Sequence, residues 1–202
     1  MTTQRTELTR IDPASLRIEL YPTEALKTKA SALDLSGGVS DELRAIALRM
    51  VDLMRGAQGI GLAAPQVGIS HRLFVAHVPP DPEGDPDLHE QAEPGLATST
   101  EEAQVFINPR IVEFSRDLEP YDEGCLSLPG ITGEVNRPTT VTMHAFDLDG
   151  HEVTLRATGL LARCWQHEID HLDGVLIIDR MTQMSRLRNR SKIRSMEKGA
   201  KR

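Results

Sequence analysis

Cysteines, aromatic residues and long apolar runs are all scarce in this sequence of 202 residues. Two cysteines cannot build the disulfide framework of a small secreted scaffold. Mean hydropathy is −0.31, and no apolar run approaches the ~20 residues that a membrane-spanning helix needs. The N-terminus lacks the apolar segment of a secretory signal, although Arg5 and Arg10 leave an organellar address open. We therefore expect a soluble, cytoplasmic protein with no membrane partner.

Charge is distributed unevenly along the chain. Residues 181–202 contain eight Lys or Arg and one acidic residue, whereas residues 1–180 contain 15 basic and 29 acidic residues. The acidic part argues against a nucleic-acid binder, because phosphate contacts need basic side chains. We expect one domain over 1–180 and a basic C-terminal helix or tail over 181–202. The tail is either a solvated helix or a surface that docks to RNA.

Apolar spacing predicts two main helices. Ser40 is expected to cap a helix that ends at Gly56, with apolar residues at helical spacing between them. A second, buried helix is expected over 158–172, followed by Gly174. Strand-like runs are expected at 72–78, 104–107, 110–115, 139–146 and 151–156, and a short extended run at 175–178. This order predicts an α+β fold, with antiparallel or mixed strands packed around the second helix.

The segment 79–103 differs from its surroundings in composition. It contains five prolines and eight acidic residues, with no Lys or Arg. Such a composition buries too little apolar surface to offset the entropy lost on ordering. We expect a mobile acidic loop.

The second helix carries the pattern H-E-x-x-H at His167, Glu168 and His171. Histidines four residues apart leave one face of a helix about one turn apart and can reach one metal ion. Glu168 is offset around the helix and suits a general base. The alternative is a pair of histidines on a charged surface, but the neighbouring apolar residues indicate a buried helix, in which unpaired polar groups would be costly.

A catalytic metal site of this kind needs a third protein ligand from elsewhere. Cys125 follows a glycine in the run Glu-Gly-Cys-Leu-Ser, and a thiolate is a strong donor. On local grounds alone, a metal ligand and a buried structural cysteine are equally good interpretations of Cys125. Cys164, three residues before His167, is better interpreted as a small core thiol.

A third segment, 59–66, reads Gly-Ile-Gly-Leu-Ala-Ala-Pro-Gln. Its small side chains would let another backbone lie close and pair with it. Gln66 is an uncharged donor suited to a developing oxyanion. A glycine-rich turn is the alternative interpretation.

These three segments, in this order, resemble the three signature motifs of the peptide deformylase family. The resemblance covers about residues 20–180, and the N-terminal part around Tyr21 and Pro22 matches only weakly. It implies removal of the N-terminal formyl group from formyl-methionyl nascent peptides, with release of formate. It also implies one divalent metal ion, most often Fe(II), with Zn, Ni or Co able to replace it.

The resemblance assigns roles to residues at matching positions. The implied metal ligands are Cys125, His167 and His171. Glu168 matches the general acid and base, while Gln66 and the backbone N–H of Leu126 match the groups that hold the formyl oxygen. Gly61 matches a residue whose backbone pairs with substrate. The implied methionine pocket is lined by Ile60, Gly124, Cys164 and His167.

Family resemblance also favours docking of the basic tail to the ribosome. Two other functions remain as alternatives. One is a metallo-endopeptidase that shares only the H-E-x-x-H helix, and the other is a non-catalytic ribosome-binding homologue. Intact Glu168 and Gln66 argue against the second, because a protein that only binds needs neither.

Overall fold

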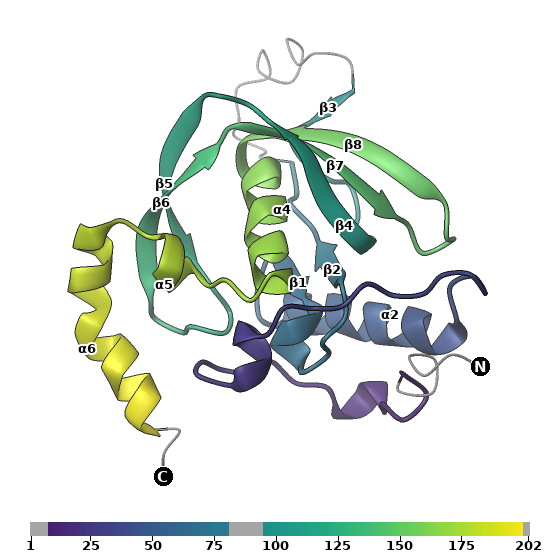
Figure 1. The fold of residues 1–202 in the computed structure, drawn as a ribbon, viewed down its shortest axis with the longest axis horizontal. Helices are drawn as coiled ribbons and strands as arrows, with labels where there is room; N and C mark the ends of the chain where they lie inside the picture. The colour runs from purple at the N-terminus through teal and green to yellow at the C-terminus, as the bar shows by residue number, and fades with distance from the viewer. Residues whose placement is uncertain (1–7, 81–94, 200–202) are drawn as a thin grey trace.

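The computed structural model describes residues 8–80 and 95–199. A six-stranded sheet has the order β1-β2-β4-β7-β8-β3, and a separate two-stranded hairpin pairs β5 with β6 (Figure 1). All pairs are antiparallel except β3 with β8. The strands are β1 (Gly61–Ala63), β2 (Leu73–Ala76), β3 (Leu96–Ala97), β4 (Gln104–Phe114), β5 (Leu118–Gly124), β6 (Thr132–Pro138), β7 (Thr140–Phe146) and β8 (Glu152–Thr158).

Helical segments connect and flank these strands. They are η1 (Pro13–Ser15), η2 (Glu24–Lys27), α2 (Asp41–Gly56), η3 (Ala64–Val67), α4 (Gly159–Leu172), α5 (Ile177–Arg180) and α6 (Gln183–Gly199). Helix α4 runs through the middle of the molecule, between the six-stranded sheet and the β5–β6 hairpin (Figure 1). It contacts β1, β2 and β8 as well as β6. The predicted α+β class, with strands around a central helix and a C-terminal helix, is confirmed.

Local signals set the ends of both main helices. The Ser40 side chain accepts a hydrogen bond from the Leu43 N–H at 3.3 Å and so caps α2. Gly174 follows α4 with φ of +74°. A Cβ there would lie 2.6 Å from the Lys27 carbonyl oxygen, so this position requires glycine. Both predicted helices are therefore confirmed.

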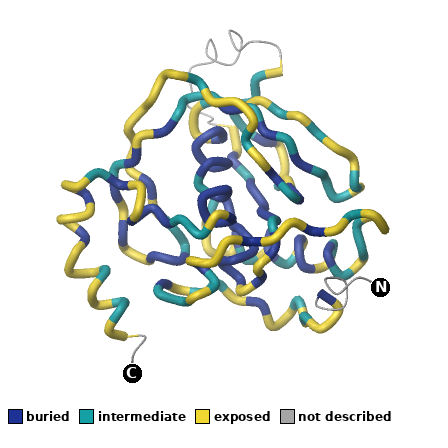
Figure 2. The backbone as a smooth tube through the Cα atoms, viewed as in Figure 1, coloured by how far each residue is buried: buried dark blue, intermediate teal, exposed yellow. Residues whose placement is uncertain are grey.

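Helix α4 is buried on almost every side (Figure 2). Trp165 is fully buried, and its ring meets the edge of Phe106 at 5.5 Å between ring centroids. The polar residues Gln166, Glu168 and His171 of the same helix are buried as well. Because burying polar groups is costly unless they are partnered, these side chains need partners inside the fold.

Four details differ from the sequence-based expectations. The strands predicted at 104–107 and 110–115 form one strand, β4, whose register shifts between Ile107 and Arg110. The hairpin β5–β6 was not predicted. The extended run predicted at 175–178 is wrong at its end, because Ile177 begins the short helix α5. Of the predicted acidic loop, residues 81–94 lie outside the described residues, and the loop prediction is wrong at Leu96 and Ala97, which pair with β8.

Within the described ranges, every helix is too short or too polar to cross a membrane. The division of the chain at residues 180 and 181 stays a prediction.

Candidate metal centre

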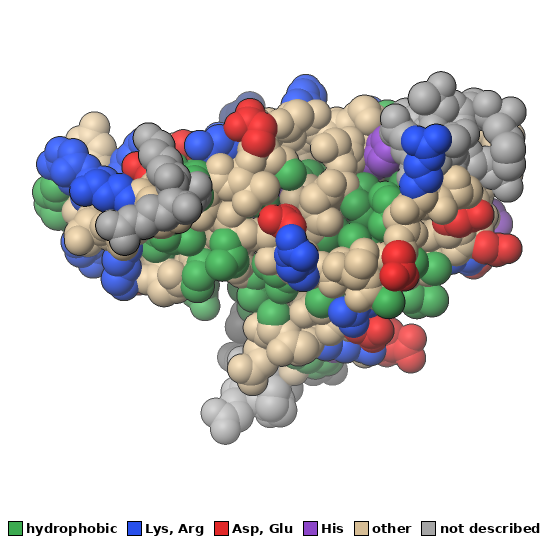
Figure 3. Space-filling view, turned by 90° about the horizontal axis from the view of Figure 1, so that it is seen from below, with side chains coloured by type: hydrophobic (Ala, Val, Ile, Leu, Met, Phe, Trp, Pro, Cys, Tyr) green, Lys and Arg blue, Asp and Glu red, His purple; other side chains and the backbone are tan. Residues whose placement is uncertain are grey.

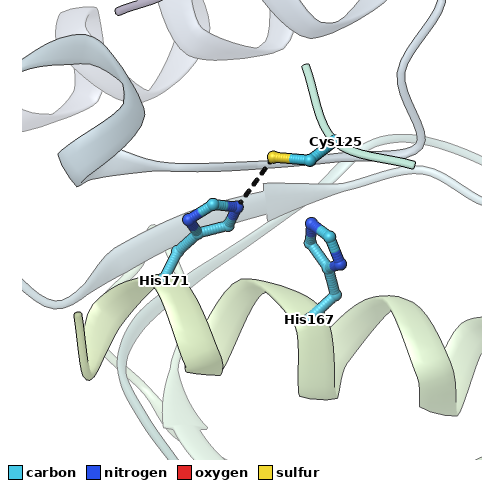
Figure 4. A group of neighbouring side chains, drawn as sticks. All are labelled: Cys125, His167 and His171. Atoms are coloured by element: carbon cyan, nitrogen blue, oxygen red, sulfur yellow. Dashed lines mark hydrogen bonds between the residues drawn. The ribbon is translucent and has the colours of Figure 1, made fainter. Parts of the chain in front are cut away.

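The side chains of Cys125, His167 and His171 point toward one another (Figure 4). Cys125 follows β5, and the two histidines lie one turn apart on α4. One potential ligand atom from each residue lies within 4.8 Å of the others, and the Cys125 Sγ is 3.2 Å from the His171 Nε2. The sequence-predicted ligands are thus brought together, with one sulfur and two imidazole nitrogens facing one another.

Burial and hydrogen bonding set the protonation of the two histidines. The Nδ1–H of His167 donates to the Glu123 Oε2 at 3.0 Å, which leaves Nε2 for the cluster. Burial alone would lower the pKa of His167, but hydrogen bonds with Cys125 and Glu123 raise it well above its ordinary range. Burial holds the pKa of His171 well below its ordinary range, so that ring is neutral.

The donor set fits a divalent transition metal. Thiolate and imidazole suit several first-row ions, and three protein ligands leave a position for a reactant. Two buried polar atoms beside the cluster, the Glu168 Oε2 and the His171 Nδ1, have no hydrogen-bond partner among the described residues. Within that part of the chain, Cys164 does not belong to the group, which agrees with its interpretation as a core thiol.

Glu168 is next to the cluster and only 3% exposed. Burial is the main cause that raises the pKa of its carboxyl group, to about 7. A carboxyl group with this pKa can both accept and release a proton near neutral pH.

The Gln66 side chain is fixed in one orientation. Its Oε1 accepts a hydrogen bond from the Ala63 N–H at 2.8 Å. Its Nε2 therefore points the other way, 3.2 Å from the Ser127 Oγ and 3.6 Å from the Cys125 Sγ. The amide presents a donor to the cluster, as an oxyanion-binding group must.

A cavity of about 490 Å³ opens beside these groups. Every sequence-predicted site residue lines it except His171, which is 1% exposed. Its lining includes Ile60, Gly61, Gln66, Gly124, Cys125, Leu126, Cys164, His167 and Glu168. Gly61 is needed here because a Cβ would lie against the Glu168 carboxylate and 2.9 Å from the Cys164 Sγ.

Known proteins are similar to this chain in sequence and in fold. The family model for polypeptide deformylases matches residues 15–187. The chain belongs to the polypeptide deformylase family.

Relatives in this family match over most of the chain. Peptide deformylase 2 of Gloeobacter violaceus is 49% identical over 144 residues, which cover 71% of this chain and 68% of the relative. A peptide deformylase of Synechococcus is 39% identical over 94% of this chain and 85% of its own. The crystal structure of the Ehrlichia chaffeensis peptide deformylase superposes with a TM-score of 0.80 at 31% identity, covering 92% of this chain and 97% of that one.

In this deformylase fold a buried ion-pair network supports the cluster, and sequence reasoning missed it. Glu123 forms two hydrogen bonds with Arg137, at 2.6 and 2.9 Å, and a third with the Arg163 Nη1 at 2.9 Å. Arg137 also reaches Asp170 on α4 at 2.8 Å, and Asp170 bonds Arg180 of α5 at 2.7 Å. The network links the β5–β6 hairpin and α5 to α4, the helix that carries both histidines.

The network fixes the charge of Glu123. Burial alone would raise the pKa of Glu123, but hydrogen bonds from His167 and Arg137 outweigh it and lower the pKa to about 2. The residue therefore stays ionised and holds the His167 ring. Glu123 could have been identified from the sequence, because it stands two residues before the predicted ligand Cys125. Arg137 and Arg163 could not, because only the fold brings them to the site.

The cavity also extends beyond the residues that the motifs indicated. Tyr121 and Leu160 line it at the surface, and the Arg163 guanidinium lies over the Tyr121 ring at 5.3 Å. These side chains come from β5 and α4, so the shape of the cavity depends on both elements.

Proposed function

We propose that this protein removes the N-terminal formyl group from formyl-methionyl nascent peptides and releases formate. The carrying observation is the cluster of Cys125, His167 and His171 beside Glu168 and the Gln66 amide, in one cavity of a deformylase fold. Newly made chains carry this formyl group where they emerge, so we place the activity in the cytoplasm.

The metal would be held by the Cys125 Sγ and by the Nε2 atoms of His167 and His171. When bound, a divalent ion supplies Lewis acidity, which polarises the formyl group and lowers the pKa of water toward ~7. Family resemblance favours Fe(II), and the same donors suit Zn, Ni or Co.

Glu168 is the proton carrier of the proposed reaction. Its carboxylate takes a proton from the attacking water and passes it to the departing amine nitrogen. A pKa of about 7 suits both transfers. Burial keeps bulk water away from this carboxyl group, so the proton goes to the amine.

The formyl oxygen gains negative charge as the water attacks. The Gln66 Nε2–H and the backbone N–H of Leu126 would donate to this oxygen from two sides of the cavity. Because the Ala63 N–H fixes the Gln66 amide in advance, little reorganisation accompanies the reaction.

The peptide backbone would add to β1, which lies at the edge of the six-stranded sheet. Gly61 has no side chain to prevent this approach. The methionine side chain would enter between Ile60, Gly124, Cys164 and His167, where the lining is mostly apolar.

Mass spectrometry tests this function directly. The anaerobically purified protein is loaded with Fe(II) or Ni(II), its metal content is measured, and a formyl-methionyl tripeptide is added. We expect loss of the formyl group, and a Glu168→Ala variant with equal metal content should lose at least ~100-fold in rate. Cleavage inside the peptide would indicate an endopeptidase, and no reaction with metal bound would indicate a binding protein.

The outer surface of α6 is basic and suits a second binding partner besides the peptide. Arg190 and Arg194 are exposed one turn apart, and basic side chains gather over this helix (Figure 3). We infer that this surface docks to ribosomal RNA, near the substrate. The double variant Arg190→Gln/Arg194→Gln should cosediment less with ribosomes, and the affinity of the wild-type protein should fall steeply with salt. Equal cosedimentation of both proteins at low salt would contradict the docking.

A further inference from the structure

The inner face of α6 packs against the chain that forms the cavity. Ser185 is fully buried and Asn189 is 7% exposed. These residues are four apart and therefore share one face of the helix. The partly buried Ile193 and Met196 continue this face into the apolar cluster around Leu128 and Ile131.

This inner face binds three backbone groups of the segment 130–134. The Asn189 Nδ2 donates to the Thr132 carbonyl at 2.7 Å, and the Lys192 Nζ donates to the Gly130 carbonyl at 2.6 Å. The Ser185 Oγ accepts from the Glu134 N–H at 3.1 Å. Side chains of α6 thus bind the first residues of β6 and the turn before it.

The same segment lines the cavity on its other side. Gly130, Ile131 and Thr132 are among the lining residues. Between Cys125 and Ile131 the chain makes local turn bonds, from the Leu128 N–H to the Cys125 carbonyl and from the Ile131 N–H to the Leu128 carbonyl. Because both bonds are local to the turn, its position relative to the rest of the cavity depends on contacts from other elements.

A second connection reaches the same turn through Tyr21. Its hydroxyl donates to the Glu197 Oε1 at 2.8 Å, and its backbone N–H donates to the Ser127 carbonyl at 2.9 Å. The C-terminal half of α6 is therefore linked to Ser127, and its middle to Gly130 and Thr132.

We propose that α6 positions the 130–132 wall of the cavity, and that Asn189 and Lys192 are positioning residues for peptide binding. The inference rests on the proposed deformylase activity for its kinetic readout. Other contacts hold the reacting groups, since Glu123 holds His167 on α4 and the Ala63 N–H holds Gln66 on η3. Loss of the α6 contacts would therefore weaken peptide binding more than the chemical step.

Steady-state kinetics with a formyl-methionyl tripeptide separates these effects. We expect Asn189→Ala to raise KM about fivefold and Lys192→Met about threefold, with kcat within about twofold of wild type. Asn189→Asp should raise KM at least as much as Asn189→Ala, because a carboxylate oxygen would face the Thr132 carbonyl. Lys198→Met, an exposed charge change on the same helix, is the matched control and should leave KM unchanged.

Hydrogen exchange gives a readout that needs no activity. In the metal-loaded protein, peptides covering residues 128–134 should exchange about tenfold faster in Asn189→Ala than in wild type or Lys198→Met. An unchanged exchange rate and an unchanged KM in Asn189→Ala would overturn the proposal, and so would an equal KM shift in Lys198→Met. An inactive wild-type protein would contradict the proposed function alone, since the exchange result would still decide the role of α6.

Discussion

The two sides of the cavity are built on different physical principles. The sheet wall, residues 59–66, is anchored in the six-stranded sheet, where Gly61, Leu62 and Ala63 pair with β2 and where Leu62 and Ala63 are fully buried. The hairpin wall, residues 121–132, lies outside that sheet. It is fixed by buried charges at Glu123 and by the side chains of α6. The first wall should therefore be sensitive to added volume, and the second to lost charge.

The largest effect is expected when the hairpin wall loses its central charge. Glu123→Ala would leave Arg163 without its carboxylate partner and Arg137 with Asp170 alone, which costs about 3–5 kcal/mol. The milder Glu123→Gln should fold and bind metal about 10–100-fold more weakly, because the His167 ring loses its ionised acceptor. Metal titration and denaturant unfolding measure both effects.

Glu119→Gln is the matched control for this prediction, since Glu119 is exposed on the same strand. If Glu123→Gln and Glu119→Gln bound metal equally well, the charge of Glu123 would not be what fixes the hairpin wall.

Acid should weaken the hairpin wall selectively. The pKa of Glu123 is about 2 in the folded protein, against an ordinary value of 4.5. The stabilising contribution is therefore complete above pH 4.5 and is lost as the pH falls toward 2, by up to about 3 kcal/mol. The unfolding free energy of the metal-free wild type should approach that of Glu123→Gln over this range. A difference between the two that is independent of pH would contradict this prediction.

Added volume should distinguish the two walls at a pair of glycines. Gly61→Ala would push a methyl group against Glu168 and Cys164, at a cost of about 1–3 kcal/mol in stability. At Gly124 the nearest atom to a new Cβ is the Thr132 Cγ2 at an ordinary 3.7 Å. Gly124→Ala should therefore unfold at the same denaturant concentration as wild type or slightly higher. Similar losses of stability in Gly61→Ala and Gly124→Ala would contradict the proposed difference between the two walls.

The smallest effect concerns the link from Tyr21 to α6. Burial, followed by the hydrogen bond to Glu197, raises the pKa of Tyr21 to about 12 from its ordinary value of 10.0. The protonated hydroxyl therefore stabilises the fold fully below pH 10, and this contribution is lost as the pH rises toward 12. Tyr21→Phe should cost about 1 kcal/mol at neutral pH. The unfolding free energies of Tyr21→Phe and wild type should become equal as the pH rises toward 12. A difference between them that stays constant up to pH 12 would contradict this prediction.

The same contrast explains what the sequence could predict. The α2 and α4 helices follow from local spacing, caps and Gly174, and the metal ligands follow from short motifs. The β5–β6 hairpin does not, because its polar strand Leu118–Gly124 has no apolar alternation. It depends on pairs such as Glu123 with Arg163, 40 residues apart, which no local pattern contains. The register shifts in β4 and the short helix α5 likewise depend on tertiary packing.

The position of β1 has a consequence for the range of proteins on which the enzyme can act. This edge strand is three residues long, so it offers ~10 Å of backbone for pairing. An added peptide would be aligned over only its first few residues, mostly through main-chain groups that every sequence possesses. Residues beyond that length would make no contacts with the cavity. Such a site would treat very different proteins alike.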